Sequence, residues 1–268
     1  MITTSPASVL HLFKGTLKIE SQWYEPRGDF PQACQRASLV LLHEGLGCIA
    51  MWKQFPQALA DATGSRVFAY SRQGYGASSP IAGARPIDFM QDEAQRVLPA
   101  VLDAVGIESP ILIGHSDGAS IALLAAALVP NIRAITVMAP HLFVEKISID
   151  SIEKAHEFYE MKASGMREKL ANYHSDVDGA FYGWANIWLK PEFGDWSITD
   201  QVKKIICPVL AIQGEQDQYG SMAQLDSLKS LVPQSELTKL NDCRHSPQFD
   251  QPEAVISAIA RFVSTIAK

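Results

Sequence analysis

The sequence lacks three features that would direct a chain to membranes or to nucleic acids. No stretch of its 268 residues approaches the roughly 18 consecutive apolar residues of a membrane-spanning helix. Residues 1–14 lack the charged and then apolar pattern of a secretory signal peptide. Basic residues are outnumbered, with 23 Lys and Arg against 29 Asp and Glu. We therefore expect a cytoplasmic protein with no membrane partner and no nucleic-acid partner.

Cysteine is scarce, and its spacing matches no metal site. The four cysteines are Cys34, Cys48, Cys207 and Cys243, and none of them forms the short C-x-x-C pair typical of zinc ligands. Cys207 begins an apolar segment that predicts a buried strand. Free thiols in a reducing compartment are therefore expected rather than disulfides. The sequence implies no metal and no organic cofactor.

Apolar segments with strand and helix patterns alternate along most of the chain. Hydrophobic residues make up 47% of the sequence, which is enough for one large core. Pro99 should kink or delay a helix predicted around it. The alternation predicts a mostly parallel sheet with helices on both faces. The predicted elements are a hairpin over 9–23, strands over 38–42, 66–70, 110–113, 134–138, 207–214 and 237–240, and helices over 51–63, 90–105, 119–129, 221–231 and 254–266.

A serine in a strand-to-helix turn is the strongest indication of chemistry. The motif G-H-S-D-G occupies residues 114–118, between the predicted strand 110–113 and the predicted helix 119–129. Its glycines allow a tight turn that exposes the side chain of Ser116. The helix start also places free N–H groups where a negatively charged oxygen would form. Ser116 is the predicted nucleophile, and the alternative is a purely structural turn.

An acid and a histidine follow the serine in the order that such a nucleophile requires. Asp217 follows the apolar segment 207–214, in a loop at the predicted end of a strand. His245 lies in a polar turn and is the only histidine after His174. His245 would take the proton of Ser116, while Asp217 would orient and stabilise the imidazolium. The alternative for His245 is a solvated residue on a surface loop.

Five motifs in this order resemble those of α/β-hydrolases of the lidded esterase and C–C hydrolase type. They are H-E-G-L-G at 43–47, R-Q-G-Y-G-A-S at 72–78, the turn at 114–118, G-E-Q-D at 214–217 and H-S-P at 245–247. The resemblance covers almost the whole chain and implies an α/β fold built on a mostly parallel α/β-hydrolase sheet. It is a weak guide to substrate, because this fold supports many reactions.

The resemblance also implies an oxyanion hole, with two departures from the usual pattern. Relatives usually have His-Gly where this chain has His43 and Glu44. By that alignment, the N–H groups of Gly45 and Asp117 are the two predicted oxyanion donors. An acidic residue directly after the nucleophile is unusual, and the simpler interpretation of Asp117 is a helix cap.

Three carboxylates are predicted near the serine, and two arrangements of them remain open. If Glu44, Asp117 or Glu215 faces the site, it would repel an anionic substrate and favour a neutral acyl group. Alternatively, Glu44 and Glu215 turn into solvent or pair with Arg72 or Arg244. The first arrangement disfavours dicarboxylate-like substrates.

The segment 141–200 breaks the alternation and matches the position of the family's lid. It is charged and aromatic, and it predicts several short helices inserted after the sixth strand. The core would then comprise residues 1–140 and 201–268. Trp184 and Trp188 are four residues apart and share one helical face. Together with Glu44, they are the predicted residues of the substrate pocket.

These features predict a serine carboxylesterase that hydrolyses neutral, small to medium esters through an acyl-enzyme. One alternative is a C–C bond hydrolase of aromatic meta-cleavage products, which would need basic residues to hold its carboxylated substrate. The other is a ligand receptor built on the hydrolase fold. Haloalkane dehalogenase and epoxide hydrolase activities are disfavoured, because relatives with those activities carry aspartate at the position of Ser116. The expected partner is a small-molecule ester, and a monomer and a homodimer both remain open.

Overall fold

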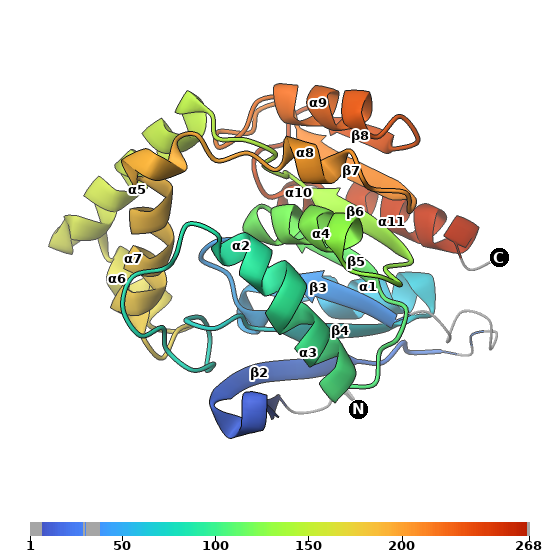
Figure 1. The fold of residues 1–268 in the computed structure, drawn as a ribbon, viewed down its shortest axis with the longest axis horizontal. Coiled ribbons are helices and arrows are strands. Elements are labelled where there is room, and N and C mark those ends of the chain that lie inside the picture. The colour runs from blue at the N-terminus through green and yellow to red at the C-terminus, as the bar shows by residue number, and fades with distance from the viewer. Residues whose placement is uncertain (1–6, 29, 31–37, 267–268) are drawn as a thin grey trace.

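The computed structural model describes residues 7–28, 30 and 38–266, which form a sheet of eight strands with helices around it (Figure 1). The strand order is β1-β2-β4-β3-β5-β6-β7-β8. β1 and β2 form the predicted antiparallel hairpin and β2 pairs antiparallel with β4, whereas all other neighbours are parallel. The mostly parallel sheet confirms the predicted fold. The strands are β1 (Ser8–Leu12), β2 (Leu17–Tyr24), β3 (Ser38–Leu42), β4 (Arg66–Tyr70), β5 (Ile111–His115), β6 (Ala134–Met138), β7 (Val209–Gly214) and β8 (Glu236–Leu240).

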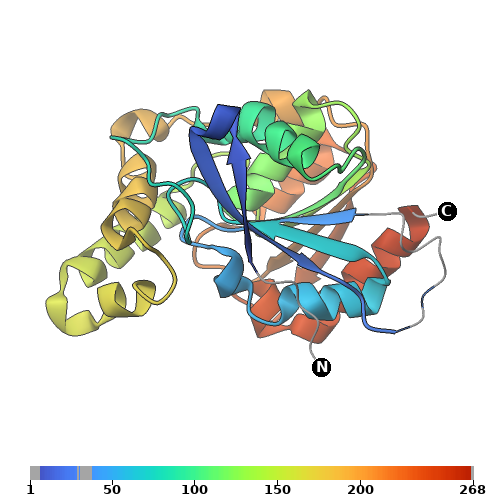
Figure 2. The same ribbon diagram turned by 90° about the horizontal axis from the view of Figure 1, so that it is seen from below.

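Helices cover both faces because the central strands are apolar on both sides. On β3, Leu39 and Leu41 belong to the cluster that α1 and α11 complete, whereas Val40 and Leu42 belong to the opposite cluster with α3 and α4. Figure 2 shows these two layers on either side of the sheet. The core helices are η1 (Phe13–Gly15), η3 (Ile49–Trp52), α1 (Phe55–Thr63), α2 (Phe89–Asp92), η4 (Glu93–Val97), α3 (Leu98–Ala104), α4 (Asp117–Leu128), α9 (Ala223–Leu231), α10 (Pro247–Asp250) and α11 (Pro252–Ile266).

The helix predicted over 90–105 is divided into three parts around Pro99. The α-helix α2 passes into a π-helical turn, η4, and α3 then begins directly before the proline. Proline has no N–H to donate and is tolerated in the first turn of a helix, so the regular pattern is interrupted just before it. The predicted late start is wrong, because the helical segment begins at Phe89; the irregularity before Pro99 is the π-helical turn.

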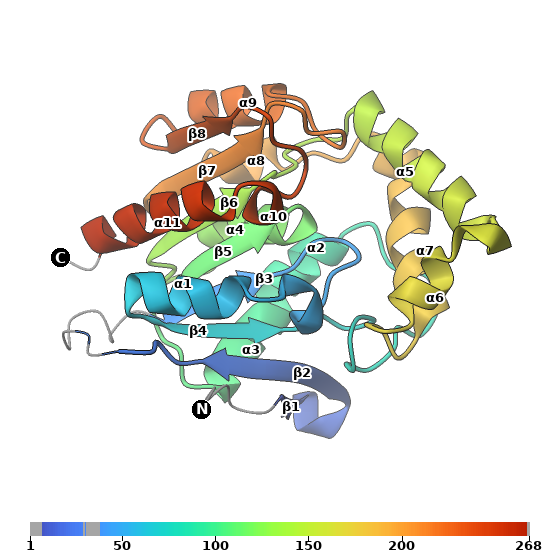
Figure 3. The same ribbon diagram turned by 180° about the vertical axis from the view of Figure 1, so that it is seen from behind.

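A helical segment separates β6 from β7. Its helices α5, α6 and α7 stand together at one end of the molecule, beyond the ends of the strands (Figures 1 and 3). The last helix, α8, crosses the predicted boundary at residue 200 and packs against α4 and α9 of the core. The elements of this segment are α5 (Lys146–Glu160), η5 (Lys162–Ser164), α6 (Met166–Leu170), α7 (Val177–Trp188), η6 (Pro191–Phe193) and α8 (Thr199–Val202).

Two of the expectations drawn from scarce features can be compared with the structure. Cys48, Cys207 and Cys243 have free thiols, as expected, while Cys34 lies outside the described residues. Within the part of the chain that the structure describes, no helix has both the length and the apolar character needed to cross a membrane.

Candidate active site

Ser116 occupies a strained turn between β5 and α4. Its φ of 53° and ψ of −118° lie in a region that residues with a side chain rarely adopt. The neighbouring glycines permit the turn. A Cβ on Gly114 would overlap the backbone of Gly118, and one on Gly118 would overlap the carbonyl of Leu42. Close packing of the helix start against β3 and β5 therefore requires both glycines and turns the serine outward.

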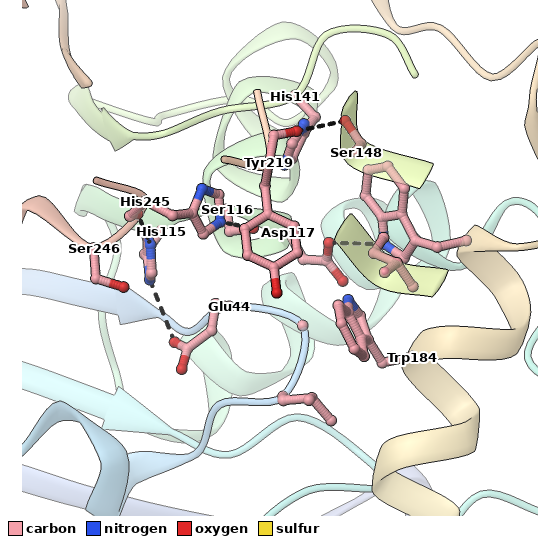
Figure 4. A pocket seen from close by; sticks show the side chains of 14 residues that line it. Glu44, His115, Ser116, Asp117, His141, Ser148, Trp184, Tyr219, His245 and Ser246 are labelled. Carbon is pink, nitrogen blue, oxygen red and sulfur yellow. Dashed lines mark hydrogen bonds and ion pairs between the residues drawn. The ribbon is translucent and has the colours of Figure 1, made fainter. Parts of the chain in front are cut away.

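The three residues predicted to act together form one hydrogen-bonded chain, of which Figure 4 shows Ser116 and His245. The distance from Ser116 Oγ to His245 Nε2 is 3.0 Å, and that from His245 Nδ1 to Asp217 Oδ1 is 2.8 Å. Ser116 follows β5, Asp217 follows β7 and His245 follows β8. Loops at the carboxyl ends of parallel strands meet at one edge of a sheet, and this brings the three residues together.

Several donors hold Asp217 in its ionised form. Oδ1 accepts the N–H groups of Tyr219 at 2.8 Å and Gly220 at 3.3 Å, and Oδ2 accepts Nε2 of Gln213 at 3.1 Å. Burial raises the pKa of Asp217, but the hydrogen bond and the charge of His245, with the Tyr219 N–H, outweigh it and leave the pKa below its ordinary value. The carboxylate can therefore orient His245 with its proton on Nδ1.

The peptide group between Glu44 and Gly45 is fixed by three hydrogen bonds. The carbonyl of Glu44 accepts from His43 Nδ1 at 2.7 Å, from Arg72 Nη2 at 2.9 Å and from Gly47 N–H at 3.1 Å. Burial and the nearby Arg72 lower the pKa of His43 well below its ordinary value, so the ring is neutral. Because a peptide group is planar, holding its carbonyl also fixes the direction of the Gly45 N–H. The sequence did not predict that His43 or Arg72 would position an oxyanion donor, although both residues lie in its motifs.

Two backbone N–H groups beside the serine are available as donors. They belong to Gly45 and to Asp117, the first residue of α4. Within the described residues, neither N–H has a hydrogen-bond acceptor. They are the two groups that the family resemblance predicts for an oxyanion hole.

A cavity of about 140 Å³ opens in front of the serine. Of the predicted site residues, Asp217 alone is not part of its lining, because it lies behind His245. The lining also contains seven residues that the sequence analysis did not assign to the site. The predicted residues in the lining are Glu44, Gly45, Ser116, Asp117, Trp184, Trp188 and His245, and the additional ones are Leu46, His115, His141, Ser148, Ile152, Tyr219 and Ser246.

Trp184 and Trp188 reach the cavity from the same face of α7, and Figure 4 labels the first of them. The indole of Trp184 lies so close to Gly45 that a Cβ there would overlap it. Trp188 Nε1 donates to Asp117 Oδ1 at 3.2 Å, and its ring lies edge-on to His141, with ring centres 5.0 Å apart. The helical segment after β6 therefore contributes an aromatic wall to the cavity.

Asp117 does not act as a helix cap. Its Oδ1 bonds Trp188, and its Oδ2 has no hydrogen-bond partner among the described residues although the side chain is buried. Burial raises the pKa of Asp117, against the opposing charges of Arg72 and Arg85. A capping hydrogen bond is absent because the carboxylate bonds α7 rather than the backbone N–H groups of its own helix, while its acidic charge does lie in the first turn of α4, where the helix dipole favours it.

Glu44 faces the cavity and pairs with His115, not with Arg72. Its Oε2 is 3.4 Å from His115 Nδ1, while Arg72 bonds only the backbone carbonyl of Glu44. Burial raises the pKa of Glu44, but the hydrogen bond and charge of His115 outweigh it, so the pKa lies below its ordinary value. His115 Nε2 lies 2.8 Å from the carbonyl of His245 and so connects the Glu44 loop to the His245 loop. By contrast, Glu215 is exposed and outside the cavity lining.

Two further side chains surround His245. The ring centre of Tyr219 lies 4.7 Å from that of His245, and the ring centre of His141 lies 5.9 Å from it. Burial, with the charge of His245, lowers the pKa of His141 to about 3, so its ring is neutral. His141 follows β6, a position whose functional use the sequence pattern did not show. In the described ranges, no three His, Cys, Asp or Glu side chains are arranged to hold a metal ion.

Comparisons with known proteins agree with this geometry. A model of the Alpha/beta hydrolase family matches residues 39–258. The bifunctional esterase/perhydrolase DCH of Acinetobacter calcoaceticus is 26% identical over 184 residues, which span 58% of this chain and 65% of that relative, just under two thirds of its length. The sn-1-specific diacylglycerol lipase ABHD11 of Mus musculus is 20% identical over 258 residues, or 85% of this chain and 81% of the lipase.

A solved structure of similar fold is that of a thermophilic esterase from Thermogutta terrifontis. Its TM-score is 0.73 at 17% identity, and the match covers 98% of this chain and 100% of the esterase. At this identity the likeness concerns the fold alone. The family model spans most of the chain, however, and its match agrees with the order of the motifs and with the parallel sheet. The chain therefore belongs to the alpha/beta hydrolase family and is a hydrolase.

Proposed function

We propose that this hydrolase is a serine carboxylesterase for neutral, small to medium esters. The observation that carries the proposal is the hydrogen-bonded chain from Asp217 through His245 to Ser116, which ends in a cavity beside two unoccupied N–H donors. Nucleophile, base and orienting acid are the groups that acyl transfer requires. The esterase activity named for the relative from Acinetobacter calcoaceticus supports the same reaction class.

In the proposed mechanism, His245 Nε2 takes the proton of Ser116 as Oγ attacks the ester carbonyl. The N–H groups of Gly45 and Asp117 stabilise the oxyanion of the tetrahedral intermediate. His245 then protonates the leaving alcohol, and an acyl-enzyme remains on Ser116. His245 next activates a water molecule that hydrolyses the acyl-enzyme, while Asp217 stabilises the imidazolium in both steps.

Residues 141–200 are proposed to be a lid on a core of residues 1–140 and 201–268. Trp184, Trp188 and Ile152 come from this segment and line the cavity. Their apolar side chains would exclude water and contact the substrate. The cavity of about 140 Å³ is similar in volume to cavities of roughly 150 Å³ that accommodate benzene. Short acyl groups therefore fit it best.

A panel of p-nitrophenyl acetate, butyrate, hexanoate and octanoate tests the proposal. We expect rapid multiple turnover, with the highest kcat/KM for acetate or butyrate, because the cavity is small. A receptor would release at most one p-nitrophenol per molecule. A C–C hydrolase would instead prefer a coloured ring-cleavage dienoate, a preference that the absence of Arg and Lys among the described lining residues does not support. Either of these outcomes would contradict the esterase proposal.

The enzyme should discriminate against anionic acyl groups. Glu44 lines the cavity, and its lowered pKa keeps it charged at neutral pH. Two unit charges about 6 Å apart repel by roughly 2.8 kcal/mol at an effective dielectric of about 20, or about a hundredfold in rate. Solvent entering the site weakens this repulsion. We therefore expect kcat/KM for p-nitrophenyl butyrate to exceed kcat/KM for p-nitrophenyl hemisuccinate by about tenfold in low salt.

Separate variants identify the carboxylate responsible for this discrimination. Glu44→Gln should narrow the difference between the two esters, and Asp117→Asn tests the second carboxylate of the cavity. Glu215→Gln is the matched control, because Glu215 is exposed and outside the lining. Equal kcat/KM values for the two esters in the unmodified enzyme would show that neither carboxylate acts on the acyl group.

A further inference from the structure

We propose that the Asp117 carboxylate recognises a hydrogen-bond donor, a hydroxyl or an ammonium group, on the α or β carbon of the substrate's acyl group. The proposal rests on the esterase function proposed above and specifies its substrate class. It assigns a role to the side chain of Asp117. The proposed mechanism uses only the backbone N–H of this residue.

The first observation is an unpaired oxygen on a buried carboxylate. Asp117 is 1% exposed, and Oδ1 has one donor, Trp188 Nε1 at 3.2 Å. Oδ2 has no hydrogen-bond partner among the described residues. Buried polar atoms in proteins are almost always paired, because an unpaired one loses its hydration without compensation. Because Asp117 is among the residues that line the cavity, a donor on a molecule bound there would complete this carboxylate.

The second observation is that the two neighbouring arginines donate hydrogen bonds to backbone carbonyls and not to Asp117. Arg72 donates to the backbone carbonyls of His43 and Glu44. Arg85 donates to the carbonyl of Gly183 at 3.2 Å and is 3.4 Å from that of Gln73. Neither arginine belongs to the lining of the cavity. Neither arginine therefore supplies the donor that Asp117 Oδ2 lacks.

The third observation is the position of the carboxylate relative to the reacting atoms. Asp117 follows Ser116 directly, and both line the same small cavity. Figure 4 shows the carboxylate beside the indole of Trp184, and the indole of Trp188 donates to it at 3.2 Å. In a cavity close to the size of benzene, a group bound there lies within two or three bonds of the carbonyl carbon. Apolar walls also strengthen a hydrogen bond to the carboxylate, because they lower the local dielectric.

Two isosteric series of ethyl esters test the proposal. At the β carbon the series is 3-methylbutyrate, 3-hydroxybutyrate and 3-aminobutyrate, and at the α carbon it is isobutyrate, lactate and alaninate. Each replaces a methyl by a hydroxyl or an ammonium group at nearly constant volume. The quantity measured is the ratio of kcat/KM for the donor ester to kcat/KM for its methyl counterpart, by titration of released acid at neutral pH.

Comparing this ratio between variants cancels the intrinsic reactivity of the esters. In at least one series, Asp117→Leu should lower the ratio by about tenfold or more, the usual effect of losing a hydrogen bond to a charged group. Asp117→Asn has the same shape but no charge, so it should lose the preference for ammonium and keep part of that for hydroxyl. This isosteric variant keeps the test decisive if Asp117→Leu does not fold. Glu44→Gln removes the charge of the other carboxylate in the cavity. It should leave the hydroxyl-to-methyl ratio as it is, because a hydroxyl carries no charge, whereas the ammonium-to-methyl ratio should fall, because Glu44 attracts a cation as it repels an anion.

Three results would overturn the proposal. One is an equal ratio in the unmodified enzyme, Asp117→Leu and Asp117→Asn. Another is an equal fall in the hydroxyl-to-methyl ratio in Glu44→Gln, which would show that the preference does not depend on Asp117 in particular. The third is a preference seen only when the hydroxyl is on the alcohol part of the ester, as in ethylene glycol monobutyrate compared with propyl butyrate. Failure of the esterase function is distinguished separately, because Ser116→Ala would then retain the hydrolysis of all these esters.

Discussion

Replacing Ser116 with alanine should lower kcat for p-nitrophenyl butyrate by about 10⁴- to 10⁶-fold. The variant has no oxygen to attack the carbonyl, so the acyl-enzyme route is closed and only the oxyanion donors and substrate binding remain. The fold should be unaffected, because alanine keeps the Cβ and the side-chain oxygen bonds only His245. Steady-state kinetics, with circular dichroism and Tm as checks of folding, measure both effects.

A control for Ser116 is available in the same cavity. Ser246 also lines the cavity but belongs to the turn after His245. We expect Ser246→Ala to retain kcat within a few-fold. If Ser116→Ala kept more than about a tenth of the activity, or if Ser246→Ala were the inactive variant, the nucleophile would be misassigned.

Replacing Asp217 with asparagine should lower kcat by about 10⁴-fold. The substitution removes the negative charge that stabilises the imidazolium of His245. It also presents an amide where a carboxylate accepted Nδ1–H, Tyr219 N–H and Gln213 Nε2, and this favours the wrong tautomer of His245. The shape of the side chain is unchanged, so KM should change far less than kcat.

Glu215→Gln is the matched control for Asp217→Asn. Glu215 lies two residues earlier in the same loop and carries the same charge, but its side chain is exposed. Its substitution should change kcat by less than about twofold, as expected for a surface residue. A severe loss in Glu215→Gln together with a mild one in Asp217→Asn would place the catalytic acid two positions earlier.

The arrangement of strands and helices could be predicted because it depends on local patterns. The strands predicted over 38–42, 66–70 and 134–138 coincide with β3, β4 and β6. Continuous apolar segments are sufficient for such strands, which are buried on both faces. The interruption of the regular α-helix just before Pro99 is also a local effect, because it follows from the missing N–H of this one residue.

The sequence order was sufficient to nominate Ser116, Asp217 and His245. Each follows a predicted strand, and parallel strands bring their carboxyl ends to one edge of a sheet. Once the parallel sheet is inferred, residues more than a hundred positions apart can be expected at one place. The hydrogen bonds between them are a result of the structure, because a pattern in sequence specifies which edge a residue occupies and not which atoms meet.

Only the tertiary structure decided which side chains surround the hydrogen-bonded Ser116, His245 and Asp217. Arg72 holds the carbonyl of Glu44 from 28 residues away, and Trp188 bonds Asp117 from 71 residues away. Both contacts depend on how loops and the helical segment after β6 pack, which no local period encodes. The sequence left open whether Glu44 faces the site or turns to solvent or Arg72, and the structure has it in the cavity lining, paired with His115. The Asp117 carboxylate bonds Trp188 and no backbone N–H of its own helix. Side chains in loops take partners according to which elements fold against them, so the polar environment of the serine follows from packing rather than from sequence.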